Sequence, residues 1–420
     1  MNYSINIMAT GNNCVIICPE INKKMFPFTE TLSCLLPIGN SNTLSIILDK
    51  ITKDEFDEII IIGSANSGLE AIAEKYEVKF LEKKENYIEQ IYSNTNMQGN
   101  TLIIKGNLLI SEKDYCGIND NLKGEESAVL IDILDRYDKS NSEFGVKAED
   151  KIFSIYGHPR EHYVNGKILG AFIIHGNDMN YFKTCMKGFH NVNCGQMPDN
   201  HYYIEEVIQN AIEANCYFKS IWSDTKSTMI NFPWDISKGN ELFCMSLNSM
   251  NKNTLGENFE MDETCCLRGY LESGNNVVIR NNVIFEGNCS IGSNVRIEAG
   301  VIIGKNVIIK DNTTIQYHSR IIDNTVIGSN NKIGYNAEIK GVTFDGVCAV
   351  HGCEISGVIG QKVDIAAGVL MAILRFDDEL VTQRIDNKNY ANPYTNNIFI
   401  GNYCRTGVGN IFLRGVKIGN

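Results

Sequence analysis

Residues 277–339 read, in groups of six, VVIRNN VIFEGN CSIGSN VRIEAG VIIGKN VIIKDN TTIQYH SRIIDN TVIGSN NKIGYN AEI. The third residue of every group is Ile or Phe, from Ile279 to Ile339. Helices repeat about every 3.6 residues and strands about every 2, so neither element alone gives this period. A chain that turns a corner every six residues does, and three such sides close one coil of a parallel β-helix. Each buried ladder side chain contributes roughly 1.5–3 kcal/mol, so the coils can stabilise one another without helices.

A second ladder occupies the first position of each group, from Val277 to Ala337. The six-residue step then continues, displaced by two residues, at Val347, Cys353, Ile359, Ile365 and Met371. The stretch 374–397 has no repeat and contains Asn392-Pro393, which predicts a loop that leaves the coil. The step resumes after that loop at Ile400, Thr406, Phe412 and Ile418.

The sequence before the repeat has the pattern of an α/β domain. Apolar runs that predict buried strands lie at 14–18, 58–62, 101–104 and 167–176, and helical patterns lie at 43–51, 67–76, 86–93 and 201–216. Alternation of strands and helices predicts a parallel sheet with helices on both faces. We therefore expect an α/β domain over 1–245, a linker over 246–276 and the β-helix over 277–420.

Composition narrows the class of protein. The formal net charge of -12 disfavours a nucleic-acid binder, because such proteins carry basic patches. The 14 cysteines show no CxxC pair and no framework spacing, which favours a reducing compartment. No apolar run approaches about 18 residues, and the N-terminus lacks a basic-then-apolar leader. We expect a cytoplasmic protein without membrane insertion.

Five short segments carry a resemblance to a known family. They are KKMFPFTETLSCLLPIGN (23–40), Gly106-Asn107, NFPWD (231–235), IGYNAEIKGV (333–342) and VHGCEISGVIGQKVDIAAG (350–368). In this order they resemble the bifunctional sugar-1-phosphate nucleotidyltransferase/acetyltransferase family, of the UDP-N-acetylglucosamine pyrophosphorylase/glucosamine-1-phosphate acetyltransferase type. The resemblance covers nearly the whole chain. It implies a Rossmann-like nucleotidyltransferase-type α/β domain followed by a left-handed parallel β-helix of hexapeptide repeats, assembled as a homotrimer.

In the first half, the chain departs from this family at positions that bind the nucleotide. The family has phosphate-binding glycines where this chain has Glu20 and Asn22. Lys24 stands at the family arginine and keeps its charge without the bidentate fork. The resemblance implies weak nucleotide binding by Lys24, Gly106 and Asn107.

The metal site of the family is also changed. The family Gly-Asp is Gly106-Asn107 here, and the second acidic ligand is Met229, with Asn231 nearby. Asn107 and Asn231 would offer only neutral oxygens, and a site without a carboxylate would hold Mg²⁺ weakly. We expect nucleotidyl transfer to be lost.

The second half keeps more of the family pattern. Lys340 matches the lysine that contacts the sugar phosphate, and His351 matches the catalytic histidine. Acetyl transfer to an amine needs a base that takes the amine proton, and imidazoles accept protons near neutral pH. The alternative is that Lys340 is an ordinary exposed charge and His351 a polar turn residue.

Other family positions have changed in this half. Glu354 replaces a tyrosine, Ile373 an asparagine and Ile322 an arginine, although Arg320 lies two residues from Ile322. Loss of the asparagine removes an oxyanion donor, which is worth about 3 kcal/mol. We expect Lys340, Glu354 and Arg320 to bind the substrate, and Glu354 would alternatively orient the His351 ring.

Two hypotheses from different classes follow. The first is an acyltransferase that uses acetyl-CoA or another acyl-CoA and a sugar phosphate or nucleotide sugar. The second is a non-catalytic scaffold, or a subunit that senses a nucleotide sugar. Stabilisation by a bound acyl-CoA would separate them, because a ligand at about 100 times its Kd adds roughly 2.7 kcal/mol.

Overall fold

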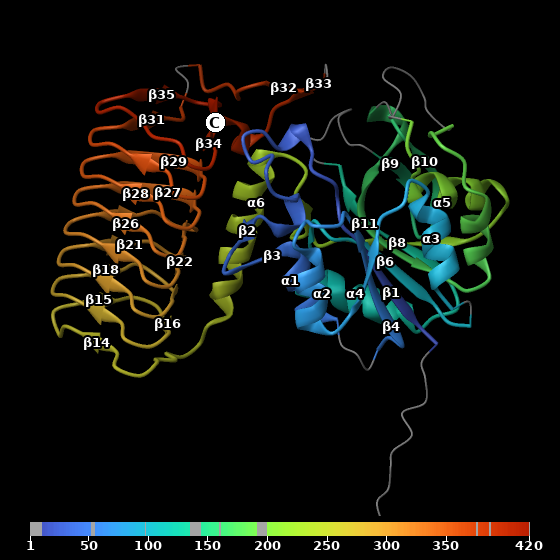
Figure 1. Ribbon diagram of the computed structural model, residues 1–420, viewed down its shortest axis with the longest axis horizontal. Coiled ribbons are helices and arrows are strands. Elements are labelled where there is room, and N and C mark those ends of the chain that lie inside the picture. Colours follow the sequence, from blue (N-terminus) through green and yellow to red (C-terminus); the bar gives the residue numbers. More distant parts are fainter. Residues whose placement is uncertain are drawn as a thin grey trace, which may run out of the picture. The chain divides into compact units, whose positions relative to one another are not determined.

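The computed structural model describes residues 11–51, 55–96, 98–134, 144–158, 161–190, 200–374, 377–385 and 388–419 (Figure 1). It divides into two compact units. Unit 1 comprises Met1–Glu20, Leu32–Leu35 and Thr43–Met229, and unit 2 comprises Ile21–Thr31, Leu36–Asn42 and Ile230–Asn420. The division therefore falls near residue 230 rather than 245, and two short early segments belong to unit 2.

The sheet of unit 1 is mixed rather than wholly parallel. Its main path runs β10-β9-β11-β6-β1-β4-β5. The four strands at one end of this path are parallel: β1 (Asn13–Ile17), β4 (Glu58–Gly63), β5 (Lys79–Glu82) and β6 (Thr101–Lys105). The antiparallel part contains β9 (Gly145–Ala148), β10 (Ile152–Tyr156) and β11 (Gly166–Ile174). β8 (Ser127–Ile133) is antiparallel to β11 and parallel to β12 (Phe218–Trp222).

Helices cover both faces of this sheet, as the sequence predicted. The side chains of α1 (Thr43–Lys50), α2 (Leu69–Tyr76) and α4 (Glu112–Leu122) share one apolar cluster with the sheet. Those of α3 (Tyr87–Asn94) and α5 (Ile204–Glu213) share the other. The predicted strands and helices are confirmed, with shifted ends. The remaining short elements of unit 1 are η2 (Ser33–Leu35), β7 (Leu108–Leu109), η3 (Glu161–Tyr163), η4 (Asp178–Thr184) and β13 (Thr228–Met229).

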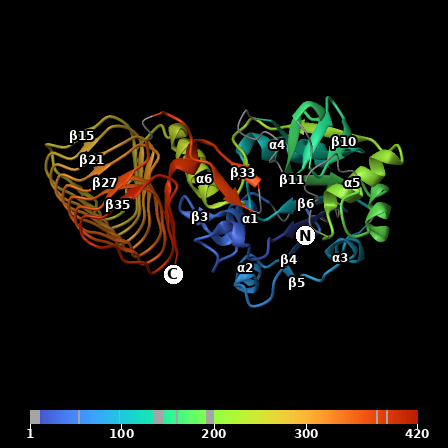
Figure 2. The ribbon, with the colours of Figure 1, turned by 90° about the horizontal axis from the view of Figure 1, so that it is seen from above.

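Unit 2 is a three-sided parallel β-helix (Figures 1 and 2). Face A contains β14 (Glu260–Met261), β17 (Val278–Ile279), β20 (Arg296–Ile297), β23 (Thr314–Ile315), β26 (Lys332–Ile333), β28 (Cys348–Ala349) and β30 (Asp364–Ile365). Face B contains β15 (Cys266–Leu267), β18 (Ile284–Phe285), β21 (Ile302–Ile303), β24 (Arg320–Ile321), the first halves of β27 (Glu338–Thr343) and β29 (Glu354–Ile359), β31 (Leu370–Ala372) and β35 (Ile411–Leu413). Face C contains β16 (Leu271–Ser273), β19 (Cys289–Ile291), β22 (Val307–Ile309), β25 (Val326–Ile327), the second halves of β27 and β29, β34 (Ile398–Ile400) and β36 (Lys417–Ile418).

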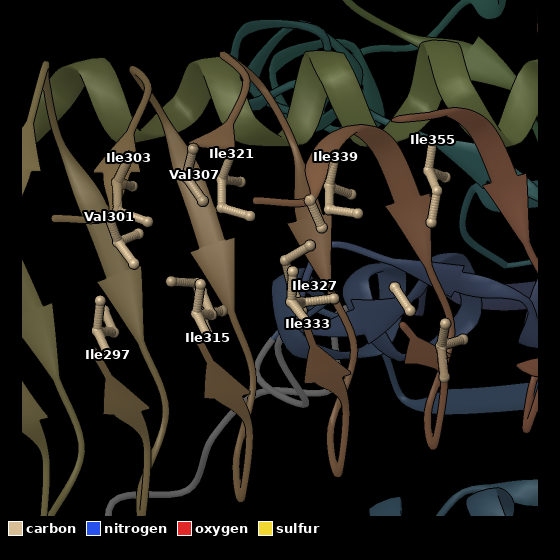
Figure 3. Close-up of a cluster of buried hydrophobic side chains, with 14 of the residues drawn as sticks. Ile297, Val301, Ile303, Val307, Ile315, Ile321, Ile327, Ile333, Ile339 and Ile355 are labelled. Carbon is tan, nitrogen blue, oxygen red and sulfur yellow. The ribbon is translucent and has the colours of Figure 1, made fainter. Parts of the chain in front are cut away.

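The predicted isoleucine ladder forms the interior of the prism. Ile303, Ile321 and Ile339 are fully buried and lie in register on successive coils. Figure 3 shows these side chains, with those of the other faces, directed into the same core. Asparagines at the corners adopt left-handed backbone angles, which asparagine tolerates better than other non-glycine residues. The Asn276 amide donates to Asn294 Oδ1 (3.0 Å) and Asn294 donates to Asn312 (3.1 Å), so one corner carries a ladder of side-chain hydrogen bonds.

The expected linker at 246–276 instead contains the first strands of the β-helix. β14, β15 and β16 pair in parallel with β17, β18 and β19. Phe259, Cys265 and Leu271 extend the second ladder backwards in steps of six, and all three pack into the core. The six-residue pattern is weaker in this segment, because Ser273 replaces an apolar residue in the first ladder and because the neighbouring outward residues are polar.

Two corners of the β-helix are shorter than the rest. Pairing advances by 18 residues per coil up to Ile321↔Ile339, but by 16 in Ile339↔Ile355 and Thr343↔Ile359. The six-residue step at Val347–Ile365 therefore does not follow one structural ladder. Val347 and Cys353 continue the second ladder, and Ile359 and Ile365 continue the first. Each shortened corner contains a glycine with positive φ, Gly341 (φ 108) and Gly357 (φ 146).

The predicted loop at 374–397 leaves the coil between β31 and β34. Its described part forms an antiparallel hairpin of β32 (Gln383–Ile385) and β33 (Lys388–Tyr390), followed by η6 (Pro393–Asn396). α6 (Pro233–Met245) packs against β27 and β29 (Figure 1). The other elements of unit 2 are η1 (Lys23–Met25), β2 (Pro37–Ile38), β3 (Ser41–Asn42) and η5 (Ser246–Ser249). Over the described ranges, none of the helices has the length and apolar character needed to cross a bilayer.

Candidate functional site

The outward side chains of face B form a column in strand register. Arg320, Glu338, Glu354 and Leu370 succeed one another from coil to coil. Arg320 Nη1 lies 3.6 Å from Glu338 Oε2, and both side chains are well exposed to solvent. An exposed pair of this kind contributes about 0–1 kcal/mol, so it would yield readily to a phosphate. The structure thus places Arg320 and Glu354 in one column, with Glu338 between them.

His351 lies at the corner between faces A and B. It follows β28, and its carbonyl accepts a hydrogen bond from Gly368 N (3.4 Å) on the next coil. On the preceding coil, the Tyr335 carbonyl accepts from Gly352 N (3.0 Å), so the two corners are in register. The rings of Tyr335 and His351 stack with centroids 4.7 Å apart and planes at 4°. His351 is exposed, so its ring is available to a ligand.

Lys340 lies at the opposite corner of face B, directly after the core residue Ile339. It is exposed, and its register partner on the next coil is Ser356. Among the described residues, no carboxylate forms an ion pair with the Lys340 ammonium. Lys340 therefore differs from Arg320 in having no partner for its charge, and an anion would supply one.

His351 and Lys340 flank the same face on successive coils. Five residues separate His351 from Ser356, the register partner of Lys340, and an extended chain rises about 3.3 Å per residue. The two corners are thus at most about 16 Å apart. A flexible lysine side chain spans part of that width, and Glu354 lies on the strand between the corners.

The changed family position Ile373 has a structural explanation. Ile373 packs against the β-helix core at the end of β31. An asparagine side chain there would have to bury its amide or turn away from the core, and burying it unpaired is costly. The isoleucine thus strengthens the core where the loop leaves the coil, and it leaves the site without that donor.

In unit 1, the candidate nucleotide-binding residues lie at the carboxyl ends of the parallel strands. Gly106 N donates to Ile17 O (2.8 Å), and Thr43 Oγ1 donates to the Gly106 carbonyl (2.8 Å). Asn107 is buried. In the sheet order β6-β1-β4-β5, the chain first adds β4 and β5 on one side of β1 and then adds β6 on the other side. Open α/β sheets commonly place ligands at such a switch point, and Gly106 and Asn107 lie there; their role in nucleotide binding stays a prediction.

Two lysines at this edge are already paired with carboxylates. Lys105 Nζ lies 2.5 Å from Glu205 Oε1, and the Glu205 side chain is almost completely buried. Lys83 Nζ lies 2.9 Å from Glu20 Oε1, and this ammonium lowers the pKa of Glu20 below its ordinary value. Neither of these two ammonium groups is therefore available to a phosphate without breaking an ion pair.

Sequence reasoning missed Glu205. The pair Glu205-Glu206 opens α5, where acidic residues usually stabilise the N-terminal end of a helix from its exposed side. Both side chains are instead buried, and Glu206 Oε1 lies 2.5 Å from His190 Nδ1. The apolar residues of α5 recur on one face of the helix, so the local pattern contains no signal that these two carboxylates are buried.

Lys24 and Asn231 belong to unit 2, whereas Gly106 and Asn107 belong to unit 1. Lys24 is half-buried, and its backbone N donates to the Asn22 side chain (2.9 Å), which caps η1. The Asn231 backbone N donates to Asp235 Oδ2 (2.9 Å). The roles expected of Lys24 in nucleotide binding and of Asn231 in metal binding stay predictions.

The residues present do not fit the Mg²⁺ that the family resemblance implies. Asn107 and Asn231 are amides, and Met229 lies in the short strand β13 paired with β7. The nearest acidic residue in the motif, Asp235, accepts from the backbone N of both Asn231 and Phe232 at the start of α6. Mg²⁺ prefers carboxylate and phosphate oxygens, so we derive no step through a metal ion.

Comparisons with known proteins agree with the resemblance seen in the sequence. No protein-family model matches the chain. The bifunctional protein GlmU of Methanococcus maripaludis is 24% identical over 418 residues, which cover 97% of this chain and 92% of that protein. Among solved structures, an inositol-1-phosphate CTP transferase from T. maritima (11% identity, TM-score 0.43) covers 55% of this chain and 95% of its own. A CTP:phosphocholine cytidylyltransferase from Streptococcus pneumoniae (14% identity, TM-score 0.43) covers 55% and 99%.

The likeness to GlmU covers nearly all of this chain and therefore spans both units. The chain is a distant homologue of GlmU over nearly its full length.

Proposed function

We propose that unit 2 transfers an acyl group from an acyl-CoA to the amine of an amino-sugar phosphate, with His351 as the base. Unit 1 has lost nucleotidyl transfer in this proposal and keeps at most a binding role. The observation that carries it is the placement of an exposed imidazole and an unpaired ammonium at the two corners of one face.

The reaction follows from ordinary acyl-transfer chemistry. The amine nitrogen attacks the thioester carbonyl carbon while the His351 imidazole takes a proton from that nitrogen. The carbon–sulfur bond then breaks, the CoA thiolate leaves, and the products are an amide and CoA after proton transfer from the imidazolium. General-base assistance of this kind contributes about 10²–10⁴-fold.

Lys340 and Arg320 would bind the phosphate of the acceptor. Lys340 offers an unpaired charge, and Arg320 can exchange its weak contact with Glu338 for a bidentate contact with phosphate. Glu354 lies between the two corners and would accept a hydrogen bond from a sugar hydroxyl or from the amine. Its carboxylate also favours an acceptor that carries positive charge at one end and phosphate at the other.

The proposed loss of nucleotidyl transfer is supported by charge. Lys83 and Lys105, at the strand ends of unit 1, are already paired with Glu20 and Glu205. Exchange of the Lys105–Glu205 pair for a phosphate contact would leave the buried Glu205 carboxylate unpaired, which costs several kcal/mol. A triphosphate would therefore bind poorly at this edge.

A homotrimer in the cytoplasm is part of the same proposal. Leu370, Ile411 and Leu413 are exposed on the last coils of face B, and adjacent apolar side chains of this kind are typical of a covered surface. Neighbouring β-helices in a trimer would cover them.

The test is an assay of acyl transfer with product identified by mass spectrometry. The donors are acetyl-, propionyl- and succinyl-CoA, and the acceptors are hexosamine 1-phosphates. We expect His351→Asn to lower kcat at least about 10²-fold, and Lys340→Met to act mainly by raising KM for the acceptor. His318→Asn is the matched control, because His318 is an exposed corner residue with φ 58 and asparagine occupies the equivalent corner elsewhere.

Two results would contradict the proposal. If no acceptor is acylated and acyl-CoA does not raise Tm, the acyltransferase proposal fails and the scaffold hypothesis replaces it. If UTP with Mg²⁺ and a sugar 1-phosphate gives a nucleotide sugar, the proposed loss in unit 1 is wrong.

A further inference from the structure

We infer that Tyr335 is a positioning residue for His351: its ring covers one face of the imidazole, so that substrate reaches His351 only from the side of Ala367. This inference rests on the proposed function and adds to it a residue and a direction of approach. Neither Tyr335 nor Ala367 was singled out by the sequence motifs.

The first argument is the geometry of the stack. The two ring planes are parallel within 4°, and their centroids lie 4.7 Å apart, which is one coil spacing. Consecutive coils hold the two backbones in register through Gly352 N to Tyr335 O. The stack is therefore built into the corner of the prism and does not depend on a flexible loop.

The second argument is that core packing does not explain the tyrosine. Tyr335 is 46% exposed and lies outside the isoleucine core. A buried aromatic residue fills volume, but an exposed one at a corner contributes little apolar burial. The main contact of its ring is with His351.

The third argument concerns the far side of the imidazole. The corner position after His351 in the same column is Ala367, since Gly368 N donates to His351 O just as Gly352 N donates to Tyr335 O. A methyl group covers far less of the imidazole than a phenol ring does. The column thus places a large ring on one side of His351 and only the methyl group of Ala367 on the other.

The chemical consequence is orientation of the base. A surface histidine rotates freely about its side-chain bonds, and only some rotamers direct a ring nitrogen at the amine. Stacking limits the ring to one plane, and a fixed general base loses less entropy when the reacting atoms meet. The amine and the thioester would then line up along the ring edge, above Ala367.

A spectroscopic test reads the stack without substrate. The His351 Hε1 proton, assigned by its loss in His351→Asn, should show an upfield ring-current shift. Tyr335→Ala should remove this shift and Tyr335→Phe should keep it. Tyr317→Ala is the control, because Tyr317 occupies the same corner one coil before Tyr335. An unshifted proton in the parent protein would overturn the inference, whatever the activity.

Kinetics test the role of the stack. We expect Tyr335→Ala to lower kcat about 10-fold with KM for both substrates within twofold, and Tyr335→Phe to recover at least half of kcat. Ala367→Phe should raise acceptor KM at least 10-fold, whereas Ala299→Phe, at the same corner four coils earlier, should have no effect.

The outcomes separate this inference from the function on which it rests. If the parent enzyme acylates an acceptor and His351→Asn abolishes turnover, but Tyr335→Ala keeps kcat, the function holds and the positioning role is wrong. If the parent enzyme acylates nothing, both are overturned.

Discussion

Replacement of Asn331 by valine tests how the β-helix shortens its coil. Asn331 is buried at a position that is occupied by Thr313 on the preceding coil and by Val295 on the coil before that. Its Oδ1 accepts from Val347 N (2.6 Å) and its Nδ2 donates to Thr343 Oγ1 (2.7 Å). Both partners lie on the shortened coil, so Asn331 supplies hydrogen bonds that the regular 18-residue register would otherwise provide.

The magnitude follows from these two bonds. Loss of the acceptor leaves the buried Val347 N–H unpaired, which costs about 1–3 kcal/mol. The Thr343 hydroxyl still accepts a hydrogen bond from Gly328 N (3.3 Å), so loss of its bond with Asn331 costs less, about 0.5–1 kcal/mol. Valine buries more apolar surface than asparagine and returns roughly 1 kcal/mol. We expect Asn331→Val to destabilise unit 2 by about 0.5–3 kcal/mol.

The assay should follow unit 2 alone, because a protein with two units need not unfold in one step. The chain has 2 tryptophans, and Trp234 in α6 belongs to unit 2. In a Trp222→Phe background, Trp234 fluorescence reports urea unfolding of that unit. Thr325→Val is the control, since the bond that its hydroxyl accepts within the described residues is a long one, from Gly341 N (3.3 Å). If Asn331→Val is as stable as the background protein, or more stable, the polar residue does not support the shortened coil and the reasoning is refuted.

Three further predictions concern charge and burial. Burial lowers the pKa of Lys417 to about 8, so between pH 8 and about 10.5 the unfolded state binds more protons and stability should rise with pH. Lys417→Met should remove this rise in urea titrations; an unchanged rise would contradict the assignment. Lys105→Ala should destabilise unit 1 by about 3–5 kcal/mol because it leaves Glu205 unpaired, and Lys105→Met with Glu205→Gln should recover most of the loss in thermal unfolding. Iodoacetamide should label the native protein at the exposed thiols before the buried ones, whose pKa is raised by burial; mass mapping that finds the reverse order would refute this. The exposed thiols are Cys116 and Cys266, and the buried ones are Cys14 and Cys289.

The periodic part of this fold could be predicted because every hexad needs an apolar side chain at the same buried position. Ile303, Ile321 and Ile339 occupy equivalent sites, so their order in the sequence is their order in the core. Face assignments in unit 1 were predictable for the same reason, since runs such as Glu58–Gly63 must be buried on both sides. The mixed sheet was not predictable, because strand direction depends on distant pairing and leaves no mark on the local apolar pattern.

Site residues were predictable to a lesser degree. The motifs named His351 and Lys340 as candidates, but their positions at opposite corners of face B follow only from the coil register. The Tyr335 contact depends on two residues sixteen positions apart, a separation created by the shortened coil. The Lys105–Glu205 pair joins residues a hundred positions apart, and no sequence period relates them.

The shortened corners and the candidate site occur at the same coils, and one physical reason connects them. A regular hexad corner places asparagine in a left-handed turn and repeats the previous coil, so it offers the same surface again. At Gly341 a Cβ would lie 2.3 Å from the Gly357 carbonyl oxygen, so the chain crosses this corner only with glycine. The loss of two residues shortens the corner after face B from Ile322–Thr325 to Lys340-Gly341, while the outward column of face B keeps its register. Lys340 therefore lies in the turn itself, one coil before His351. A repeat protein can vary its surface only where it breaks its repeat, and the candidate site lies at the coils that depart from the regular period.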